Sequence, residues 1–390
     1  MNYDVSFQNN GKLKLLIIVG TRPEIIRLAA VIGRCRDCFD TVLCHTGQNY
    51  DYTLNGIFFE ELGLQPPDVC LNTVGADLGE SMGNIIARSY SLISQIKPDA
   101  VLVLGDTNSC LSVISAKRLH VPIFHMEAGN RCRDERLPEE TNRRIVDVVS
   151  DINMAYSERA RDWLLASGLP PERVFVTGSP MAEVLQAQFT RIEASDVHKK
   201  LGLQKGGYLL LSAHREENID DERSFRSLFA AINRMAEVYD MPVLYSCHPR
   251  SAKRLDTTGF ALDPRVIRHE PLGFLDYNCL QMHAFAVISD SGTLPEESAF
   301  FTSVGRPFPA VSIRTSTERP EAIDKGCFVL AGIDETGLLQ AIETAVFLHR
   351  NGAYGTPVPD YTDLNVSVKV AKIIQSYAGI VKRTVWREGE

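Results

Sequence analysis

The chain has 390 residues, 44% of them hydrophobic and 23% charged, which is typical of a folded globular protein too long for one hydrophobic core. A formal net charge of −8 argues against nucleic acid or an anionic membrane as the binding partner. No apolar run approaches the roughly 20 residues of a membrane span, and the nine cysteines are scattered as in proteins of a reducing cytosol. A cytoplasmic protein is therefore expected.

Short, β-rich apolar runs alternate with helical stretches through the first half of the chain. In chain order they are LKLLIIVG, DTVLCHTG, AVLVLGDT, VPIFHME, INMAYSE and VFVTGSP. Such alternation indicates βαβ units, whose parallel strands are buried on both faces and therefore read as continuous apolar runs.

A second set of runs follows a polar, helical stretch around residues 181–206. It consists of GYLLLSAH, MPVLYSCHP, VIRHEPLG, AFAVISDSG, PFPAVSIR and CFVLAG. We therefore predict an α/β protein with two doubly wound, Rossmann-like domains, over residues 1–180 and 181–365. A last helix within 366–390 is expected to pack back onto the first domain. The carboxyl ends of both sheets are expected to face a cleft that holds the ligand.

The first apolar run ends in the motif VGTRPEIIR. Gly20 and Thr21 follow the predicted strand, Arg22 comes next, and Pro23 suits the first turn of a helix. Arg22 could bind a phosphate through two parallel hydrogen bonds, or it could form an ordinary surface ion pair. The sequence contains neither a G-x-G-x-x-G motif nor a P-loop, so the usual signatures of nicotinamide and ATP binding are missing.

Acidic residues follow the next strands of the first domain. Asp106 lies in GDTNS at the end of one predicted strand, Glu127 lies in HMEAGNR at the end of the next, and Glu139 and Arg143 lie in PEETNRR. Each carboxylate alone is more typical of a turn or a helix cap. Together, the three acidic positions outnumber the carboxylates that turns and caps would require. Opposed carboxylates are what the removal and return of a proton require.

In the second half, His214 follows one predicted strand and ISDSGTLPEES ends another. Ser291 and Gly292 would open a helix whose unpaired N–H groups and positive dipole end suit an anion. Glu297, one turn further, could accept hydrogen bonds from ribose hydroxyls, and Arg319 would add positive charge. The pattern predicts a nucleoside diphosphate ligand, with a simple helix cap as the alternative. No spacing resembles a metal site, so neither a metal nor a cofactor is expected.

Taken in order, these motifs resemble those of the non-hydrolysing UDP-N-acetylglucosamine 2-epimerase family, which has a glycosyltransferase-B-like fold. The resemblance covers about residues 15–330. The matching stretches are GTRPEIIR, HTGQNYD, GDTNS, HMEAGNR, PEETNRR, SDIN, TGSPM, AHREEN, HPR, SDSG, EE and TERPE.

The resemblance implies epimerisation at C2 of a UDP-2-acetamido sugar, by elimination of UDP and re-addition to the resulting glycal. The catalytic positions that it implies are Asp106, Glu127, Glu139 and His214. The UDP-sugar positions are Arg22, Arg143, Tyr277, Ser291, Gly292, Glu297 and Arg319, with Tyr277 against the uracil. A UDP-sugar is then the expected partner and a homodimer the expected assembly.

Within the family, the wording HMEAGNRCRDERLPEETNRRIVD, PLGFLDYN and SDSGT resembles the branch that makes UDP-N-acetyl-L-fucosamine for surface polysaccharides. That branch inverts C2 of UDP-2-acetamido-2,6-dideoxy-L-talose. The alternative substrate within the family is UDP-N-acetylglucosamine, which gives UDP-N-acetylmannosamine. A glycosyltransferase of the same fold, a hydrolysing epimerase and a non-enzymatic sugar-nucleotide sensor are the alternatives outside it.

Overall fold

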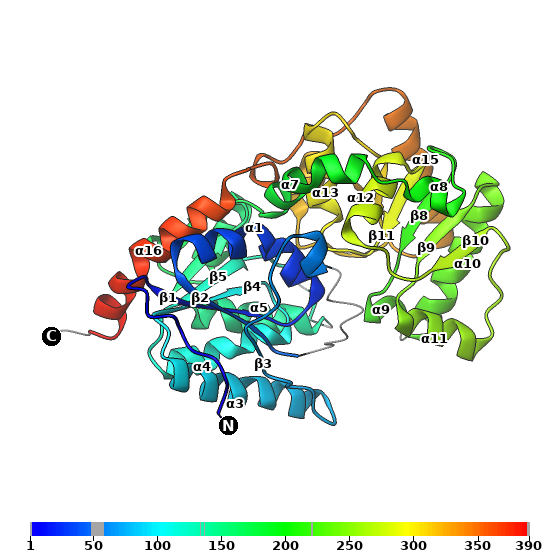
Figure 1. Ribbon diagram of the computed structural model, residues 1–390. Helices are drawn as coiled ribbons and strands as arrows, with labels where there is room; N and C mark the ends of the chain where they lie inside the picture. Colours follow the sequence, from blue (N-terminus) through cyan, green and yellow to red (C-terminus); the bar gives the residue numbers. More distant parts are fainter. Residues whose placement is uncertain (1, 48–57, 133, 136, 220, 388–390) are drawn as a thin grey trace. The chain divides into compact units, whose positions relative to one another are not determined.

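The computed structural model describes residues 2–47, 58–132, 134–135, 137–219 and 221–387. The chain divides into two compact units (Figure 1). Unit 1 comprises Met1–Gln186 together with Asp363–Glu390, and unit 2 comprises Ala187–Thr362. The division falls inside the continuous helix α7 (Met181–Glu193), whereas the sequence analysis placed it before that helix, at residue 180.

In the described residues, unit 1 has a parallel sheet of seven strands in the order β3-β2-β1-β4-β5-β6-β7. The strands are β1 Lys14–Val19, β2 Asp40–His45, β3 Val69–Cys70, β4 Ala100–Leu104, β5 Ile123–Ala128, β6 Ile152–Ala155 and β7 Val174–Val176. The helices are α1 Arg22–Cys38, α3 Leu78–Ile96, α4 Val113–Arg118, α5 Pro138–Val149, α6 Glu158–Ala166, the first part of α7, and α16 Val366–Val385, with short 3₁₀ turns η1 Asn108–Ser112 and η2 Pro171–Arg173.

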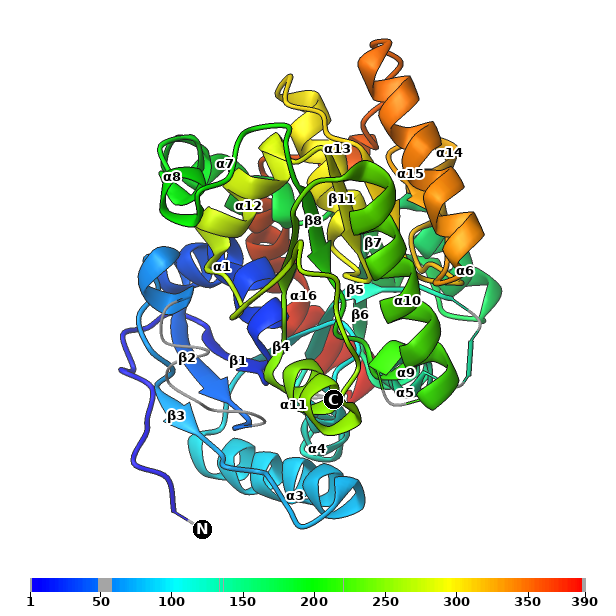
Figure 2. The ribbon, with the colours of Figure 1, turned by 90° about the vertical axis from the view of Figure 1, so that its right-hand side faces the viewer.

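Successive residues of β1 belong to opposite faces of this sheet. Leu15 and Ile17 pack in one core cluster with α1 and α16, while Leu16 and Ile18 pack in another with α3 and α4. Both faces are thus covered by helices, which explains why the strands read as continuous apolar runs. The return of α16 to this unit, alongside α1, is visible in Figures 1 and 2.

Unit 2 repeats the plan with a parallel sheet whose six described strands run in the order β10-β9-β8-β11-β12-β13. They are β8 Leu209–Ser212, β9 Val243–Ser246, β10 Val266–His269, β11 Ala286–Ser289, β12 Ala310–Ser312 and β13 Val329–Leu330. The helices are α8 Val197–Leu201, α9 Glu216–Ile219, α10 Glu222–Tyr239, α11 Pro249–Thr258, α12 Phe274–His283, α13 Leu294–Ser303, α14 Pro320–Asp324 and α15 Glu335–Arg350, with the 3₁₀ turn η3 Pro359–Tyr361.

The strand orders place a topological switch point in each sheet. In unit 1 it lies between β1 and β4, and in unit 2 between β8 and β11. Loops that follow two such strands diverge to opposite faces, so the carboxyl edge there is where open α/β sheets bind ligands. The loops concerned begin at Gly20 and Gly105 in unit 1, and at Ala213 and Asp290 in unit 2.

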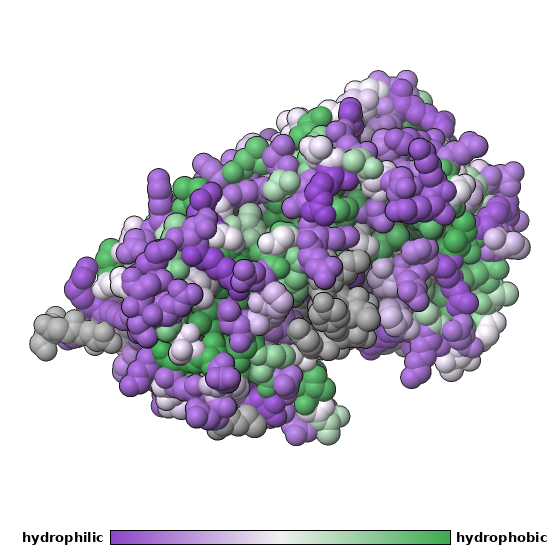
Figure 3. Space-filling model, viewed as in Figure 1, coloured by the Kyte–Doolittle hydropathy of each residue, from purple (hydrophilic) through white to green (hydrophobic). Residues whose placement is uncertain are grey.

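Most of the surface on the face shown in Figure 3 is hydrophilic, as the charge content of the chain leads one to expect. Among the described helices, none combines the length and the apolar character needed to cross a bilayer.

Candidate active site

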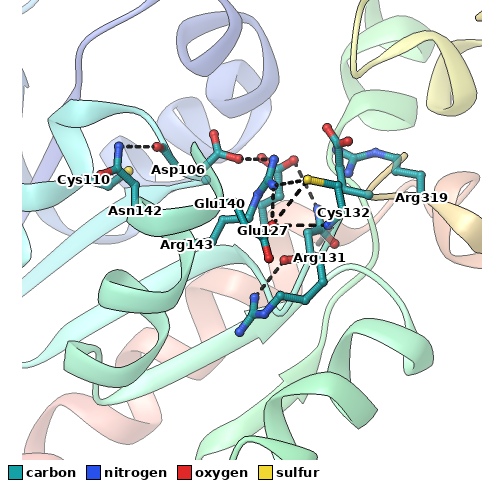
Figure 4. Close-up of polar contacts among 12 residues, drawn as sticks. Asp106, Cys110, Glu127, Arg131, Cys132, Glu140, Asn142, Arg143 and Arg319 are labelled. Carbon is teal, nitrogen blue, oxygen red and sulfur yellow. Dashed lines mark hydrogen bonds and ion pairs between the residues drawn. The ribbon is translucent and has the colours of Figure 1, made fainter. Parts of the chain in front are cut away.

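Asp106 and Arg143 form an ion pair at the carboxyl edge of the first sheet (Figure 4). Asp106 follows β4, and its Oδ2 lies 2.6 Å from Nη2 of Arg143 on α5. The Nη1 of Arg143 donates to Glu140 at 3.1 Å, and Asn142 Nδ2 donates to the carbonyl of Asp106 at 2.9 Å. Helix α5 therefore holds both the backbone and the side chain of Asp106 in one position.

Glu127 occupies a strained position on the next strand. Its φ of 62° lies in the left-handed region, and the pairing of β5 with β6 shifts register between Met126 and Ala128. Such a bulge with a non-glycine left-handed residue re-aims a side chain, at a cost typical of functional sites. The side chain, 6% exposed, is ion-paired with Arg27 of α1 and accepts a hydrogen bond from Asn130 Nδ2 at 3.4 Å.

Gly105 lets this carboxylate lie directly against the end of β4. A Cβ at Gly105 would come within 2.9 Å of Glu127 Oε2, and the φ of +79° at Gly105 is one that only glycine adopts readily. Burial raises the pKa of the nearby Cys110 thiol, and three carboxylates add to this rise. They belong to Glu24, Asp106 and Glu127. The edge of the sheet is thus a strongly negative environment that Arg27 and Arg143 partly neutralise.

Of the two neighbouring glutamates on α5, Glu139 is partly exposed and Glu140 is fully buried. Glu140 accepts from the amide of Cys132 at 3.2 Å as well as from Arg143. Both sit in the first turn of α5, where the helix dipole favours negative charge. The predicted catalytic position Glu139 is therefore the one open to a ligand, while Glu140 orients Arg143.

His125, a buried histidine in β5, contributes to the packing of the carboxyl edge of the first sheet. His125 in β5 contacts the carbonyl of Gly105 through Nε2 at 2.8 Å and Asp147 Oδ1 of α5 through Nδ1 at 3.1 Å. Burial opposes the charged form, but the interactions with Asp147 and Gly105 outweigh it and raise the pKa of His125. Asp147 also accepts from the amide of Gly129 at 3.2 Å and pairs with Arg131 at 2.7 Å. His125 thus connects β4, β5 and α5.

Arg22 begins α1 directly after the first switch-point loop. Its guanidinium carbon lies 5.0 Å from the centroid of the Phe58 ring. A guanidinium that stacks through its face keeps its N–H donors at the rim of the plane, where carboxylates and phosphates bind.

At the corresponding edge of unit 2, Asp290 organises the loop after β8. Its Oδ2, fully buried, accepts from the amides of His214 and Arg215, both at 2.9 Å. His214 Nδ1 lies 3.4 Å from Asp290 Oδ1, and 39% of the His214 side chain is exposed. His214 is therefore oriented by a buried carboxylate and remains open at the sheet edge, as a proton-transfer group must be.

The motif Ser291–Gly292 lies between β11 and α13, where the sequence analysis placed it. Thr293 caps α13, and its Oγ1 donates to Glu297 Oε1 at 2.7 Å, while Gln281 donates to Oε2 of the same glutamate at 2.7 Å. Ser291 Oγ lies 2.9 Å from Thr293 Oγ1. This end of unit 2 is built from hydroxyl groups, helix amides and the buried carboxylate of Glu297, which accepts two hydrogen bonds.

Two arginines follow β12, and they differ in environment. Arg319, 1% exposed, contacts Glu296 Oε1 through Nε at 2.7 Å and Nη2 at 2.6 Å. Glu296 thus fixes the orientation of Arg319, for which the sequence predicts a phosphate ligand. Arg314 donates from Nη1 to Glu318 at 2.6 Å, and its buried Nη2 has no hydrogen-bond partner among the described residues.

Glu318, the ion-pair partner of Arg314, lies beside the start of helix α13. A Cβ built on Gly292 would lie 3.1 Å from Glu318 Oε1, so the Arg314–Glu318 pair adjoins the Ser291–Gly292 turn. The sequence analysis missed Arg314, and an orphaned buried donor beside a helix start is a signal that only the structure provides.

Tyr277 lies on α12, which is also where the sequence analysis placed an aromatic contact to a base. Burial raises the pKa of its hydroxyl, the charge of Glu297 adds to the rise, and hydrogen bonds with Ser212 and Ser289 oppose it. The hydroxyl thus reaches the ends of β8 and β11, and the ring lies at the same sheet edge. Within the described ranges, no group of three or more His, Cys, Asp or Glu side chains is arranged to hold a metal ion.

The chain matches the family model described as UDP-N-acetylglucosamine 2-epimerase over residues 34–375. It belongs to this family. A relative in Pseudomonas aeruginosa, a UDP-2,3-diacetamido-2,3-dideoxy-D-glucuronate 2-epimerase, is 33% identical over 86% of this chain and 92% of its own length. The family therefore includes enzymes for more than one UDP-sugar.

Two solved structures of family members are similar over nearly the whole chain. The UDP-N-acetylglucosamine 2-epimerase of Rickettsia bellii is 41% identical, covers 96% of this chain and 99% of its own, and superposes with a TM-score of 0.88. The enzyme of Methanocaldococcus jannaschii, solved in complex with UDP-GlcNAc and UDP, is 30% identical, covers 93% and 100%, and has a TM-score of 0.86.

These similarities confirm three of the predictions from the sequence. The chain has the two Rossmann-like α/β domains of the glycosyltransferase-B-like fold, it is a member of the epimerase family, and it is an enzyme of the isomerase class, a UDP-sugar 2-epimerase.

Proposed function

We propose that this enzyme inverts C2 of UDP-2-acetamido-2,6-dideoxy-L-talose to give UDP-N-acetyl-L-fucosamine. The observation that carries the chemistry is the pair of carboxylates on adjacent strands of unit 1. Asp106 follows β4 and Glu127 lies in β5, and each is ion-paired with its own arginine. Two fixed acid–base groups are what the removal and return of one proton require.

The reaction needs no redox partner. The C1–O bond to UDP and the C2–H bond break, and a C1=C2 double bond forms, so that UDP and a 2-acetamidoglycal result. The leaving oxygen then bonds to C1 again while a proton is delivered to C2 from the opposite face. Asp106, Glu127 and Glu139 carry out the proton transfers in this proposal, and His214 assists the departing phosphate.

Binding of the UDP moiety is assigned mainly to unit 2. The helix start at Ser291 and Gly292 receives the diphosphate, Glu297 accepts from the ribose hydroxyls, and Tyr277 lies against the uracil. Arg314 takes the place in the proposed diphosphate clamp that the sequence analysis gave to Arg319. Its ion pair with Glu318 adjoins the Ser291–Gly292 turn, and its buried Nη2 has no hydrogen-bond partner among the described residues, whereas Arg319 contacts Glu296 through two nitrogens.

In unit 1, Arg22 serves as a second phosphate ligand, and Arg143 reaches the substrate from its position beside Asp106. The proposed homodimer stays a prediction that light scattering on the purified protein tests.

The choice of substrate rests on the wording SDSGT and PLGFLDYN. The threonine of the SDSGT motif is Thr293, whose hydroxyl donates a hydrogen bond to Glu297, the proposed ribose ligand. UDP-N-acetylglucosamine is the second candidate, because the relatives in Rickettsia bellii and Methanocaldococcus jannaschii are enzymes for that sugar.

Proton NMR in deuterated water tests the proposal with both sugars. We expect inversion of the L-talo sugar with deuterium at C2 of the product, traces of UDP and glycal, and a lower kcat/KM for UDP-N-acetylglucosamine. Product that keeps its C2 proton through repeated turnovers would exclude the elimination route. A preference for UDP-N-acetylglucosamine would assign the parent activity instead. Free sugar as the main product would indicate a hydrolysing enzyme, and transfer to an acceptor a glycosyltransferase.

A further inference from the structure

Glu24 is a carboxylate in the first turn of α1 that is fully buried and has no part in the chemistry proposed above. Its carboxylate accepts hydrogen bonds from two loops. Its Oε2 receives the amide of Gly20 at 3.0 Å and Thr21 Oγ1 at 2.8 Å, and its Oε1 receives Ser109 Oγ at 2.6 Å. The first two donors belong to the loop after β1, and the third belongs to the loop after β4.

These are the two loops of the switch point in unit 1. The loop after β1 leads into Arg22, and the loop after β4 carries Asp106. Ser109 lies in the 3₁₀ turn that follows Asp106, and its Oγ is 2.6 Å from Thr107 Oγ1, so the hydrogen-bond chain from Glu24 extends to the residue next to Asp106.

The two loops also touch directly. A Cβ at Gly20 would lie 2.7 Å from the Cβ of Ser109 and 2.5 Å from Thr46 Oγ1, so only glycine fits at this crossing. Glu24 therefore bridges two loops that also approach each other closely where Gly20 faces the side chain of Ser109. A shift of one loop must displace the other.

Stability alone does not account for a carboxylate in this place. Burial raises the pKa of Glu24, against the hydrogen bonds of Ser109, Thr21, Gly20 and Thr107, which lower it. A buried charged group is commonly no more stabilising than an apolar residue of the same volume, but it holds its partners in one geometry.

We propose that Glu24 is a positioning residue that sets the distance between the phosphate-binding Arg22 loop and the proton-transferring Asp106 loop. The inference rests on the proposed function, since it needs Arg22 and Asp106 in their assigned roles. Asp106 is held on its other side by Arg143 and Asn142 of α5. Loss of the Glu24 link leaves the loop anchored from one side only, and Asp106 drifts relative to the bound sugar.

The test uses Glu24→Gln and Ser109→Ala in the full-length enzyme, with Ser115→Ala as the matched control. Ser115 is also a buried serine of unit 1, with its Oγ bonded to the Ile86 carbonyl at 2.7 Å, but it lies in α4. We expect Ser109→Ala to lower kcat roughly 10- to 100-fold, since misplacement of a catalytic group by 1 Å can cost about that factor. Calorimetric UDP affinity should stay within a few-fold, because unit 2 supplies most UDP contacts.

Glu24→Gln should lower kcat less than Ser109→Ala, because the carboxamide oxygen can still accept from Gly20 and Thr21. The double variant should be no slower than the slower single variant, since both changes cut the same link. Ser115→Ala should lower the thermal midpoint and leave kcat unchanged.

The inference is overturned if Glu24→Gln and Ser109→Ala lower the thermal midpoint while kcat per folded molecule stays at the wild-type value. Asp106→Asn distinguishes failure of the positioning role from failure of the proposed proton chemistry. If Asp106→Asn loses turnover while Glu24→Gln and Ser109→Ala keep the wild-type turnover, only the positioning role fails. If Asp106→Asn itself turns over normally, the proposed proton chemistry fails with it.

Discussion

In unit 1 the carboxyl edge of the sheet beside the switch point carries carboxylates paired with arginines, whereas in unit 2 the switch-point loops carry hydroxyl groups and the amides of a helix start. Asp106 and Glu127 are ion-paired with Arg143 and Arg27 at the sheet edge. Asp290 follows β11 of unit 2 as Asp106 follows β4 of unit 1, but its carboxylate accepts hydrogen bonds from the amides of His214 and Arg215. The proposed function accordingly assigns most of the proton transfer to unit 1 and most of the UDP binding to unit 2.

The difference follows from what each ligand group needs. A proton moves only if the acid and base are held within hydrogen-bond reach of the reacting carbon, which rigid ion pairs achieve. A diphosphate is always charged, and helix amides, hydroxyls and a guanidinium bind it without any proton exchange. Apart from Arg22 and His214, whose proposed roles cross this division, changes in unit 1 should therefore affect turnover, and changes at the unit 2 edge should affect UDP affinity.

The largest expected effect comes from Glu127→Gln, which keeps the size of the side chain and removes its basicity. We expect kcat to fall roughly 10²- to 10⁴-fold, the range of general acid–base catalysis. Steady-state kinetics with NMR detection measures it. Glu135→Gln is the control, because Glu135 lies on the segment before α5 and is 71% exposed, paired only with Arg144 among the contacts described. A Glu127→Gln enzyme at near wild-type kcat would remove Glu127 from the mechanism.

Arg319→Ala tests whether the buried arginine of unit 2 is structural. Leaving Glu296 buried without its partner should cost about 3–5 kcal/mol of unfolding free energy, measured by urea denaturation. Arg319→Met combined with Glu296→Met should recover much of this loss. UDP affinity of the folded Arg319→Ala protein should stay within a few-fold. A tenfold or larger loss of affinity would return Arg319 to the diphosphate clamp.

Arg314→Ala should weaken UDP binding by about 10- to 150-fold, which corresponds to ~1.5–3 kcal/mol for a hydrogen bond to a charged group. Titration calorimetry measures it, with Arg306→Ala as a control, because Arg306 is an exposed arginine of the same unit paired with Glu193. Arg314→Lys keeps the charge but loses the planar fork, so an intermediate affinity is expected. Equal affinities for the wild type and Arg314→Ala would contradict the clamp.

The smallest expected effect concerns the pH dependence of stability in unit 1. A histidine whose folded-state pKa is raised stabilises the fold fully below its unfolded value of 6.5, and this stabilisation is lost as the pH rises through the folded-state pKa. His125→Gln should therefore destabilise the protein more at about pH 6 than at about pH 9. Thermal melts at both values measure this. A larger loss at the higher pH would show that His125 is held neutral.

Much of the fold could be predicted because strands covered on both faces have continuous apolar runs, as in β4 and in β1 after Lys14. The polar residues after such strands could be placed at the sheet edge for the same reason. Glu24 and His125 could not be found in this way. Each lies within a motif or strand, and its role depends on a partner distant in the sequence, Ser109 for Glu24 and Asp147 for His125.

Neighbouring residues of the same type were equally hard to separate. Glu139 and Glu140 are adjacent on α5, yet successive residues of a helix point about 100° apart, so one is open and the other buried. Arg314 and Arg319 both follow β12, and the sequence carries no sign of which one pairs with the buried Glu296. Burial and pairing are properties of the packed structure.

The most direct test of the division between the two units is the UDP affinity of Asp106→Asn, measured by calorimetry on protein whose turnover has been determined. The account predicts kcat lower by roughly 10²-fold or more and a UDP dissociation constant within a few-fold of wild type. A normal kcat would show that Asp106 is only a turn residue paired with Arg143. A loss of UDP affinity as large as the loss of turnover would show that unit 1 binds the nucleotide, and the proposed division would be wrong.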